Sequence, residues 1–148
     1  MTLNRDVTVR RLTAADYDAL LSVWAVAGLP YKPFGRDSRE ALTAELGRSE
    51  TGFLGAYLDD RLVGVVLATW DGRKGWINRL AVDPDYRNHG IGERLIREGE
   101  LFLESLGAAI IACLIEEYNL PSMSLFQKTG YVYHPDVHYF SKRKSDAT

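Results

Sequence analysis

The sequence predicts an α+β fold with a mixed, mostly antiparallel sheet, one central parallel strand pair and about four flanking helices. Three observations support this class. Short β-rich runs separated by tight turns fill the middle of the chain, segments with apolar residues at helical spacing stand on both sides of them, and one such segment leads directly into a short, continuously apolar run. The length of 148 residues predicts one domain over residues 1–148.

The first strand and helix are predicted near the N-terminus. Apolar and polar residues alternate over residues 7–12, which is typical of a half-buried strand. Thr13 and Asp16 then form a candidate N-capping pair, and apolar residues recur at helical spacing through residue 27.

A second, shorter helix is predicted over residues 38–46, with Asp37 and Glu40 as its capping pair. Three strands joined by short turns are expected to follow as a meander, at 53–58, 62–70 and 75–82.

The second half of the chain predicts a crossover. A helix over 91–106 carries a small residue, Gly99, that allows it to lie close to the sheet. Residues 110–115 are short, apolar and isoleucine-rich, which indicates a parallel strand buried on both faces. The remaining elements are a helix over about 120–129 capped by Asn119 and a last β-rich stretch that carries Tyr139 and Phe140.

Composition excludes several classes of function. Eighteen basic and twenty acidic residues leave a net charge of −2, which argues against a broad nucleic-acid surface. No apolar run approaches the roughly 18 residues of a membrane span, and the polar N-terminal sequence has no signal-peptide pattern, so we expect a cytoplasmic protein. The single cysteine, Cys113, lies in an apolar run and is expected to be a core thiol rather than a nucleophile.

A candidate anion site precedes the helix at 91–106. Gly90 and Gly92 stand at its start, where unpaired N–H groups and the helix dipole favour an anion, and glycines lacking Cβ atoms allow a diphosphate to approach the backbone. Leu95 replaces the third glycine of a dinucleotide-binding motif, and no Gly-Lys-Ser/Thr triplet of a nucleotide triphosphate loop occurs.

The segment LAVDPDYRNHGIGERLI, residues 80–96, resembles the coenzyme A loop of the GNAT acyltransferase superfamily, with Arg87, Gly90 and Gly92 at its fixed positions. NLPSMSLFQKTGY, residues 119–131, is similar to the second motif of that superfamily. The resemblance covers nearly the whole chain and implies acetyl-CoA as the cosubstrate, without a metal.

The resemblance also implies how the coenzyme binds. Its pantetheine arm would pair with the backbone of Leu80 and Val82, and its thioester would lie between the strands at 75–82 and 110–115. The N–H of Leu80 or of a neighbour would polarise the thioester carbonyl. The expected coenzyme contacts are Leu80, Ala81, Val82, Arg87, Asn88, His89, Gly90, Ile91, Gly92, Glu93, Asn119 and Phe126.

Phe126 departs from the superfamily pattern, because a tyrosine that protonates the leaving thiolate commonly occupies this position. Tyr118 is the nearest substitute in sequence, and Tyr133 and Tyr139 are alternatives, with packing as the competing role for each.

The position of the general base also departs from the pattern of some superfamily members. Trp76 stands where some relatives carry a glutamate, so Glu117, together with Glu116, is the candidate base, acting directly or through water. A weak base favours an acceptor amine of low pKa, such as an α-amine. Acceptor recognition is expected from the first two helices and their loop, including Tyr31, Lys32 and Phe34.

A metal site is not expected. His134 and His138 are four residues apart, but Pro135 between them opposes a shared helical face, and no third ligand is evident.

The sequence therefore predicts an N-acetyltransferase in which a primary amine of a small molecule or peptide attacks acetyl-CoA directly. A non-catalytic coenzyme A-binding or interaction module is the alternative, and a structural domain whose glycine turn binds nothing is a third interpretation. Exposed strand edges or the aromatic C-terminal stretch are candidate surfaces for a homodimer. The identity of the acceptor stays open.

Overall fold

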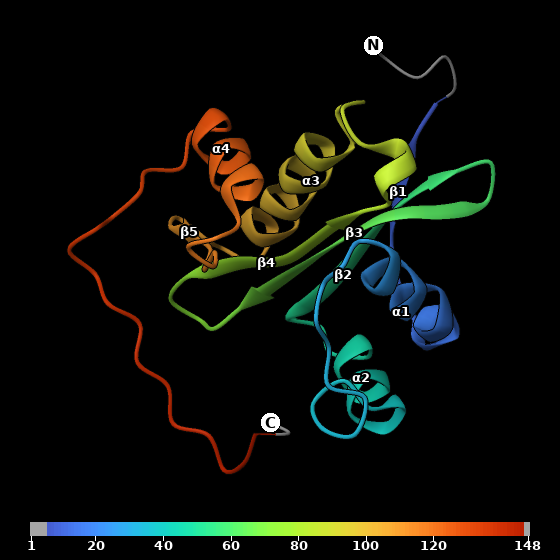
Figure 1. Cartoon of the computed structure of the whole chain (residues 1–148), viewed down its shortest axis with the longest axis horizontal. Coiled ribbons are helices and arrows are strands. Elements are labelled where there is room, and N and C mark those ends of the chain that lie inside the picture. Colours follow the sequence, from blue (N-terminus) through green and yellow to red (C-terminus); the bar gives the residue numbers. More distant parts are fainter. Residues whose placement is uncertain (1–5, 147–148) are drawn as a thin grey trace.

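The computed structural model describes residues 6–146, and it confirms the predicted fold class (Figure 1). One sheet has the order β1-β2-β3-β4-β5, in which only the β4–β5 pair is parallel among the described residues. Its strands are β1 (Thr8–Arg11), β2 (Thr51–Leu58), β3 (Arg61–Trp70), β4 (Gly75–Val82) and β5 (Ile111–Ala112). The α-helices are α1 (Tyr17–Val26), α2 (Arg39–Leu46), α3 (Ile91–Ser105) and α4 (Leu120–Lys128), and short 3-10 helices form at Ala14–Asp16 and Pro84–Tyr86.

The helices cover opposite faces of the sheet, with α1 and α2 on one side and α3 and α4 on the other (Figure 1). Alternating strand residues supply the two cores: Phe53 packs with the α1–α2 layer, whereas Leu54 packs with α3. The three-layer arrangement follows from this alternation, because each face of the sheet must bury its own apolar side chains.

Helix capping agrees with the sequence at two of three places, the 3-10 turn that precedes α1 and the start of α4. Asp16 accepts the N–H of Thr13 at 2.8 Å, and Asn119 accepts the N–H of Ser122 at 3.3 Å. The predicted pair at α2 is wrong, because the Oγ atom of Ser38 accepts the N–H of Ala41 at 3.2 Å. Asp37, the expected cap, is instead buried and lies in the site described below.

Two local predictions about the sheet are confirmed. Asp59 and Asp60 connect β2 to β3 with φ angles of 50° and 65°, as a two-residue hairpin turn with both central residues left-handed requires. A Cβ atom on Gly99 would lie 3.2 Å from Cδ1 of Ile77, so the absence of a side chain lets α3 lie close to β4.

β4 separates from β5 soon after the two strands begin. Their pairing is limited to Gly75 with Ile111 and Trp76 with Ala112. On its other edge, β4 carries one more residue than β3 between Asn78 and Ala81, so it contains a bulge. Arg79 in this bulge has a left-handed φ of 57°. The bulge and the early end of pairing together open the sheet between β4 and the chain that follows β5.

Two predictions about the C-terminal part are wrong. The strand expected at 110–115 contains only two strand residues and is not buried on both faces, since Ile110 and Leu114 are 56% and 54% exposed. The last β-rich stretch forms no strand: residues 131–146 leave α4 and run along the outside of the molecule (Figure 1). A short β5 offers few backbone groups for pairing, and Pro135 removes one donor from the incoming segment. The parallel pair consequently lies at an edge of the described sheet.

Candidate active site

Two adjoining cavities meet where β4 separates from β5. The loop cavity, about 900 Å³, lies between the end of β4, the turn before α3 and the start of α4. The sheet cavity, about 640 Å³, lies between β4, the chain after β5 and the loop between α1 and α2. Both are lined by Leu29, Pro30, Leu80, Tyr118, Asn119 and Ser122. A molecule bound in one cavity can therefore reach a molecule bound in the other at these shared residues.

The turn before α3 forms the floor of the loop cavity. Gly90 is the N-cap of α3 with a φ of 81°, and Asn88 is also left-handed, with a φ of 65°. A Cβ atom on Gly90 would meet no atom within 4 Å, so the space above it is open. The free N–H groups at the start of this 15-residue helix border that space and favour an anion there.

Gly92 has a packing role that the sequence did not indicate. A Cβ atom there would lie 2.9 Å from Cδ2 of Leu125, so glycine lets α3 pack against α4. Lys128 Nζ lies 2.6 Å from Glu93 Oε1 and joins the same two helices. The approach of an anion to Gly92 stays a prediction, whereas its contact with α4 explains the glycine by itself.

Arg87 ties the turn to its surroundings through backbone carbonyls. Its Nε donates to Val82 O at 3.1 Å, and its Nη2 donates to Ala27 O at 3.4 Å. The guanidinium thus links the end of β4 to the residue that follows α1. This places the chain that follows α1 beside the loop cavity and holds the turn in position.

The structure brings most of the predicted coenzyme contacts together. All except Phe126 line the loop cavity. Phe126 is 4% exposed, lines the sheet cavity, and packs edge-on against Tyr131 with 5.0 Å between ring centroids. Asn119 uses its side-chain oxygen to cap α4, which leaves its amide NH₂ group available at the boundary of both cavities.

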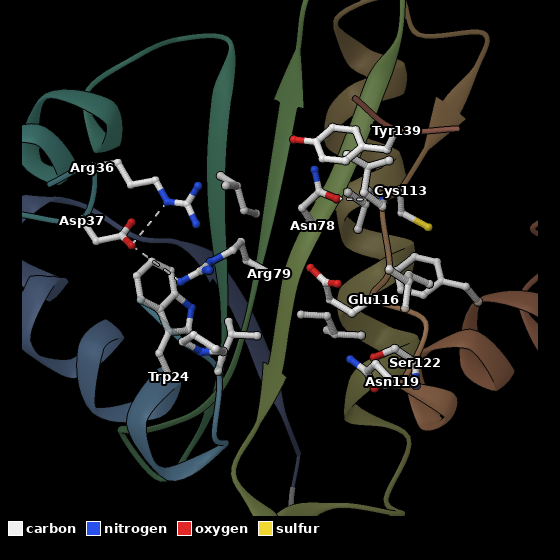
Figure 2. Close-up of a pocket in the computed structure, with 18 of the residues that line it drawn as sticks. Trp24, Arg36, Asp37, Asn78, Arg79, Cys113, Glu116, Asn119, Ser122 and Tyr139 are labelled. Atoms are coloured by element: carbon white, nitrogen blue, oxygen red, sulfur yellow. Dashed lines mark hydrogen bonds and ion pairs between the residues drawn. The ribbon is translucent and has the colours of Figure 1, made fainter. Parts of the chain in front are cut away.

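The candidate catalytic residues lie at the junction and in the sheet cavity. Tyr118 is 76% exposed and lines both cavities. Glu117 and Glu116 line the sheet cavity, and Figure 2 shows the Glu116 side chain directed toward β4. Tyr139 also lines the sheet cavity, whereas Tyr133 lines neither.

The residues expected to recognise the acceptor do not line either cavity. Tyr31 packs against Trp24, Phe34 is 97% exposed, and Lys32 Nζ donates to the backbone of Asp146 at 3.0 Å. The same loop contributes other residues instead, and the sheet cavity is lined there by Leu29, Pro30, Arg36 and Asp37.

A charged cluster missed by the sequence analysis lies on the α1–α2 side of β4, opposite Glu116 and Asn119 (Figure 2). Asp37 Oδ2 lies 3.8 Å from Arg36 Nε and 3.9 Å from Arg79 Nη2. Burial lowers the pKa of Arg79, and it raises the pKa of the half-buried Glu45 on the same wall. No sequence signal identified this cluster, because its members come from a loop, a helix and a strand bulge.

Cys113 is half-buried beside the sheet cavity, and burial raises the pKa of its thiol to about 11. At pH 8 the thiolate fraction is then about 10⁻³, against roughly a quarter for an ordinary thiol of pKa about 8.5. We expect iodoacetamide to alkylate the folded protein about 200-fold more slowly than the urea-unfolded protein at pH 8, with a rate for the folded protein that rises about tenfold per pH unit. Mass spectrometry measures both rates on this single cysteine. Equal rates would contradict the shifted pKa.

A helix start that favours an anion, next to a second cavity and to the edge of β4 that β5 leaves unpaired beyond Trp76, is the geometry expected of an enzyme that holds an acyl carrier and presents its acyl group to an acceptor. A sequence profile of the acetyltransferase (GNAT) family matches residues 17–131, and the chain belongs to this family. The predicted enzyme class, an acetyl-CoA-dependent N-acyltransferase, is thereby confirmed.

Curated and solved relatives agree with this assignment. A spermidine N(1)-acetyltransferase of Thermoplasma acidophilum is 26% identical over 84% of this chain and 88% of the relative. The PaiA N-acetyltransferase of the same organism, solved with coenzyme A, is 25% identical over 87% of this chain and 91% of its own, with a TM-score of 0.76. The aminoglycoside acetyltransferase AAC(6')-Iy, solved with a bisubstrate analogue, is 15% identical and shares the fold over 93% of this chain and 99% of its own, with a TM-score of 0.78.

Residues 6–146 contain no candidate for a membrane-spanning helix or for a metal centre. None of the described helices has the length and apolar character needed to cross a membrane. No group of three or more His, Cys, Asp or Glu side chains in the same residues is arranged to hold a metal ion.

Proposed function

We propose that this chain transfers an acetyl group from acetyl-CoA to a primary amine of a small molecule or peptide by direct attack in a ternary complex. One observation carries the proposal: the loop cavity and the sheet cavity meet at Leu80, Tyr118 and Asn119. A thioester that enters along the loop cavity would be presented there to an amine held in the sheet cavity, so the two reactants would be oriented for attack.

Coenzyme A would bind with its diphosphate at the start of α3. Gly90 leaves the backbone open at this point, and the first N–H groups of the helix can donate to phosphate oxygens. The two amides of the pantetheine arm would pair with the edge of β4 beyond Trp76, where β5 no longer does so. The N–H of Leu80 or a neighbour would then donate to the thioester carbonyl.

Tyr118 is proposed as the acid that protonates the leaving thiolate, because it is the tyrosine that borders both cavities. Glu117, with Glu116 beside it, is proposed to remove the proton of the amine, directly or through water. Deprotonating an α-amine of pKa about 7.8 at pH 7 costs about 1 kcal/mol, against about 4.6 kcal/mol for a lysine-like amine. Two exposed glutamates suit the first case better, so an amine of low pKa is the favoured acceptor.

A panel of amines tests the proposal. Free thiol is titrated while the protein is incubated with acetyl-CoA and spermidine, an aminoglycoside, amino acids or short peptides. We expect thiol release above background with at least one amine, and faster release with α-amines than with alkylamines. Tight coenzyme A binding without release across the panel would favour the non-catalytic module, which Phe126 in place of a tyrosine motivates.

A further inference from the structure

Two buried hydrogen-bond donors on the wall of the sheet cavity have no acceptor within residues 6–146. They are Nε1 of Trp24 and Nη2 of Arg79. Trp24 is 1% exposed, and the Arg79 side chain is 20% exposed. Buried donors are nearly always paired in folded proteins, so two unpaired donors on one cavity wall indicate an acceptor that arrives with a ligand.

The fold holds these two donors together. The bulge in β4 places the Arg79 guanidinium 4.2 Å from the centre of the Trp24 ring, on which it lies as a cation–π contact. The left-handed φ of Arg79 is unusual for a residue with a side chain, and such backbone strain is concentrated at functional sites. The pair therefore has a fixed geometry that a bound group can use.

Asp37 does not accept a hydrogen bond from Nη2 of Arg79. The distance of 3.9 Å between Arg79 Nη2 and Asp37 Oδ2 is too long for a hydrogen bond. The same Asp37 oxygen accepts the backbone N–H of Lys32 at 2.8 Å and also faces Arg36. One carboxylate is thus shared by two guanidiniums, and Arg79 retains donors for a second anion.

The opposite side of the sheet cavity carries negative charge instead of hydrogen-bond donors and positive charge. Glu116 borders it there (Figure 2), and its neighbour in sequence, Glu117, also lines the sheet cavity. Glu45 also lies on the Arg79 wall, where burial and the Asp37 charge raise its pKa, and within residues 6–146 it forms no ion pair or hydrogen bond with Arg79. A ligand with an ammonium group at one end and an anion at the other matches the two walls.

We propose that the acceptor carries a carboxylate as well as its amine, and that Trp24 Nε1–H and Arg79 Nη2–H donate to that carboxylate. The substrate class is amino acids and related amino-carboxylates that fit a cavity of about 640 Å³. This inference rests on the proposed acetyl transfer, because it places the amine at the thioester. The proposed acceptor class excludes polyamines, because polyamines have no carboxylate.

Matched acceptor pairs provide the test. 6-Aminohexanoate is compared with hexylamine, and lysine with cadaverine, since each pair differs by one carboxylate. Acetyl transfer is followed by thiol release, and binding in the presence of coenzyme A is followed by calorimetry. We expect the carboxylated member of at least one pair to bind and react about 10-fold better. Equal or better binding and reaction of hexylamine and cadaverine would overturn the inference.

Substitution of Trp24 by Phe removes the Nε1–H donor and keeps an aromatic ring at this position. The ring remains under Arg79, so the variant should fold, and we expect only the carboxylated acceptors to bind about 10-fold more weakly. Trp70→Phe is the control, because Trp70 is half-buried on β3 and lines neither cavity. Arg79→Gln should act in the same direction. A loss in Trp24→Phe that is equal for both members of a pair would indicate a packing role and overturn the proposal.

The two measurements distinguish this inference from the proposed function. If calorimetry shows a carboxylate preference but no amine causes release of thiol from acetyl-CoA, the result would support the ligand class and contradict acetyl transfer. If alkylamines cause release of thiol from acetyl-CoA and no carboxylate preference is found, the result would support acetyl transfer and contradict the ligand class.

Discussion

Substitution of Gly90 by Val is expected to weaken coenzyme A binding about 100-fold. The new side chain would stand at the open start of α3, where the diphosphate is proposed to approach the backbone. Charge-assisted hydrogen bonds are each worth about 1.5–3 kcal/mol, so loss of one or two of them gives an effect of this size. Calorimetry with coenzyme A measures the change.

Gly72→Val is the matched control for this variant. Gly72 has a φ of 91°, has no atom within 4 Å of an added Cβ, and lies in the β3–β4 turn away from both cavities. A left-handed residue with a side chain costs about 1–2 kcal/mol or more in either variant, so both melting temperatures should fall by several degrees. Coenzyme A binding should fall only for Gly90→Val. Unchanged binding in Gly90→Val would place the diphosphate elsewhere.

Local patterns explain why the central part of the fold could be predicted from the sequence. The β2–β3 hairpin is specified by two adjacent aspartates, and the start of α4 is specified by Asn119, so each signal lies within a few residues of its effect. Gly90 likewise marks the turn before α3. These elements place the loop cavity, which is why most of its lining residues were predicted.

The sheet cavity depends on contacts between distant segments. Arg79 reaches Trp24 and Asp37 because a bulge turns its backbone, and no residue pattern in β4 announces a left-handed arginine. Asp37 has the sequence context of a helix cap, yet the neighbouring Ser38 takes that role and leaves the Asp37 carboxylate to the cavity. The lining of the sheet cavity therefore could not be predicted from spacing, whereas the turn that lines the loop cavity could.

The C-terminal segment shows a second limit. Tyr139 and Phe140 lie in a β-rich run, but a strand forms only where a partner edge is available. β5 has only two residues, and Tyr139 instead lines the sheet cavity from outside the sheet. β-propensity indicates which residues favour a strand, but it does not indicate whether another strand pairs with them, because pairing depends on the whole sheet.

Replacement of Tyr118 by Phe is expected to lower kcat about 30-fold at pH 7 and to leave coenzyme A binding within about twofold. A leaving thiol of pKa about 8.5 costs about 2 kcal/mol to expel as a thiolate at this pH, which corresponds to this factor. Tyr118 is largely exposed, so its removal should not change folding. Steady-state rates with the best amine of the panel measure the effect.

The pH dependence and two further tyrosines identify the origin of this loss. Above about pH 8.5 the thiolate no longer needs a proton, so the difference between Tyr118→Phe and the parent protein should shrink. Tyr133→Phe should have no effect, because Tyr133 lines neither cavity, and Tyr139→Phe should alter KM for the amine rather than kcat, because Tyr139 borders only the sheet cavity. A kcat loss in Tyr139→Phe with none in Tyr118→Phe would move the acid to the C-terminal segment. It would also require that segment to stay in place throughout turnover.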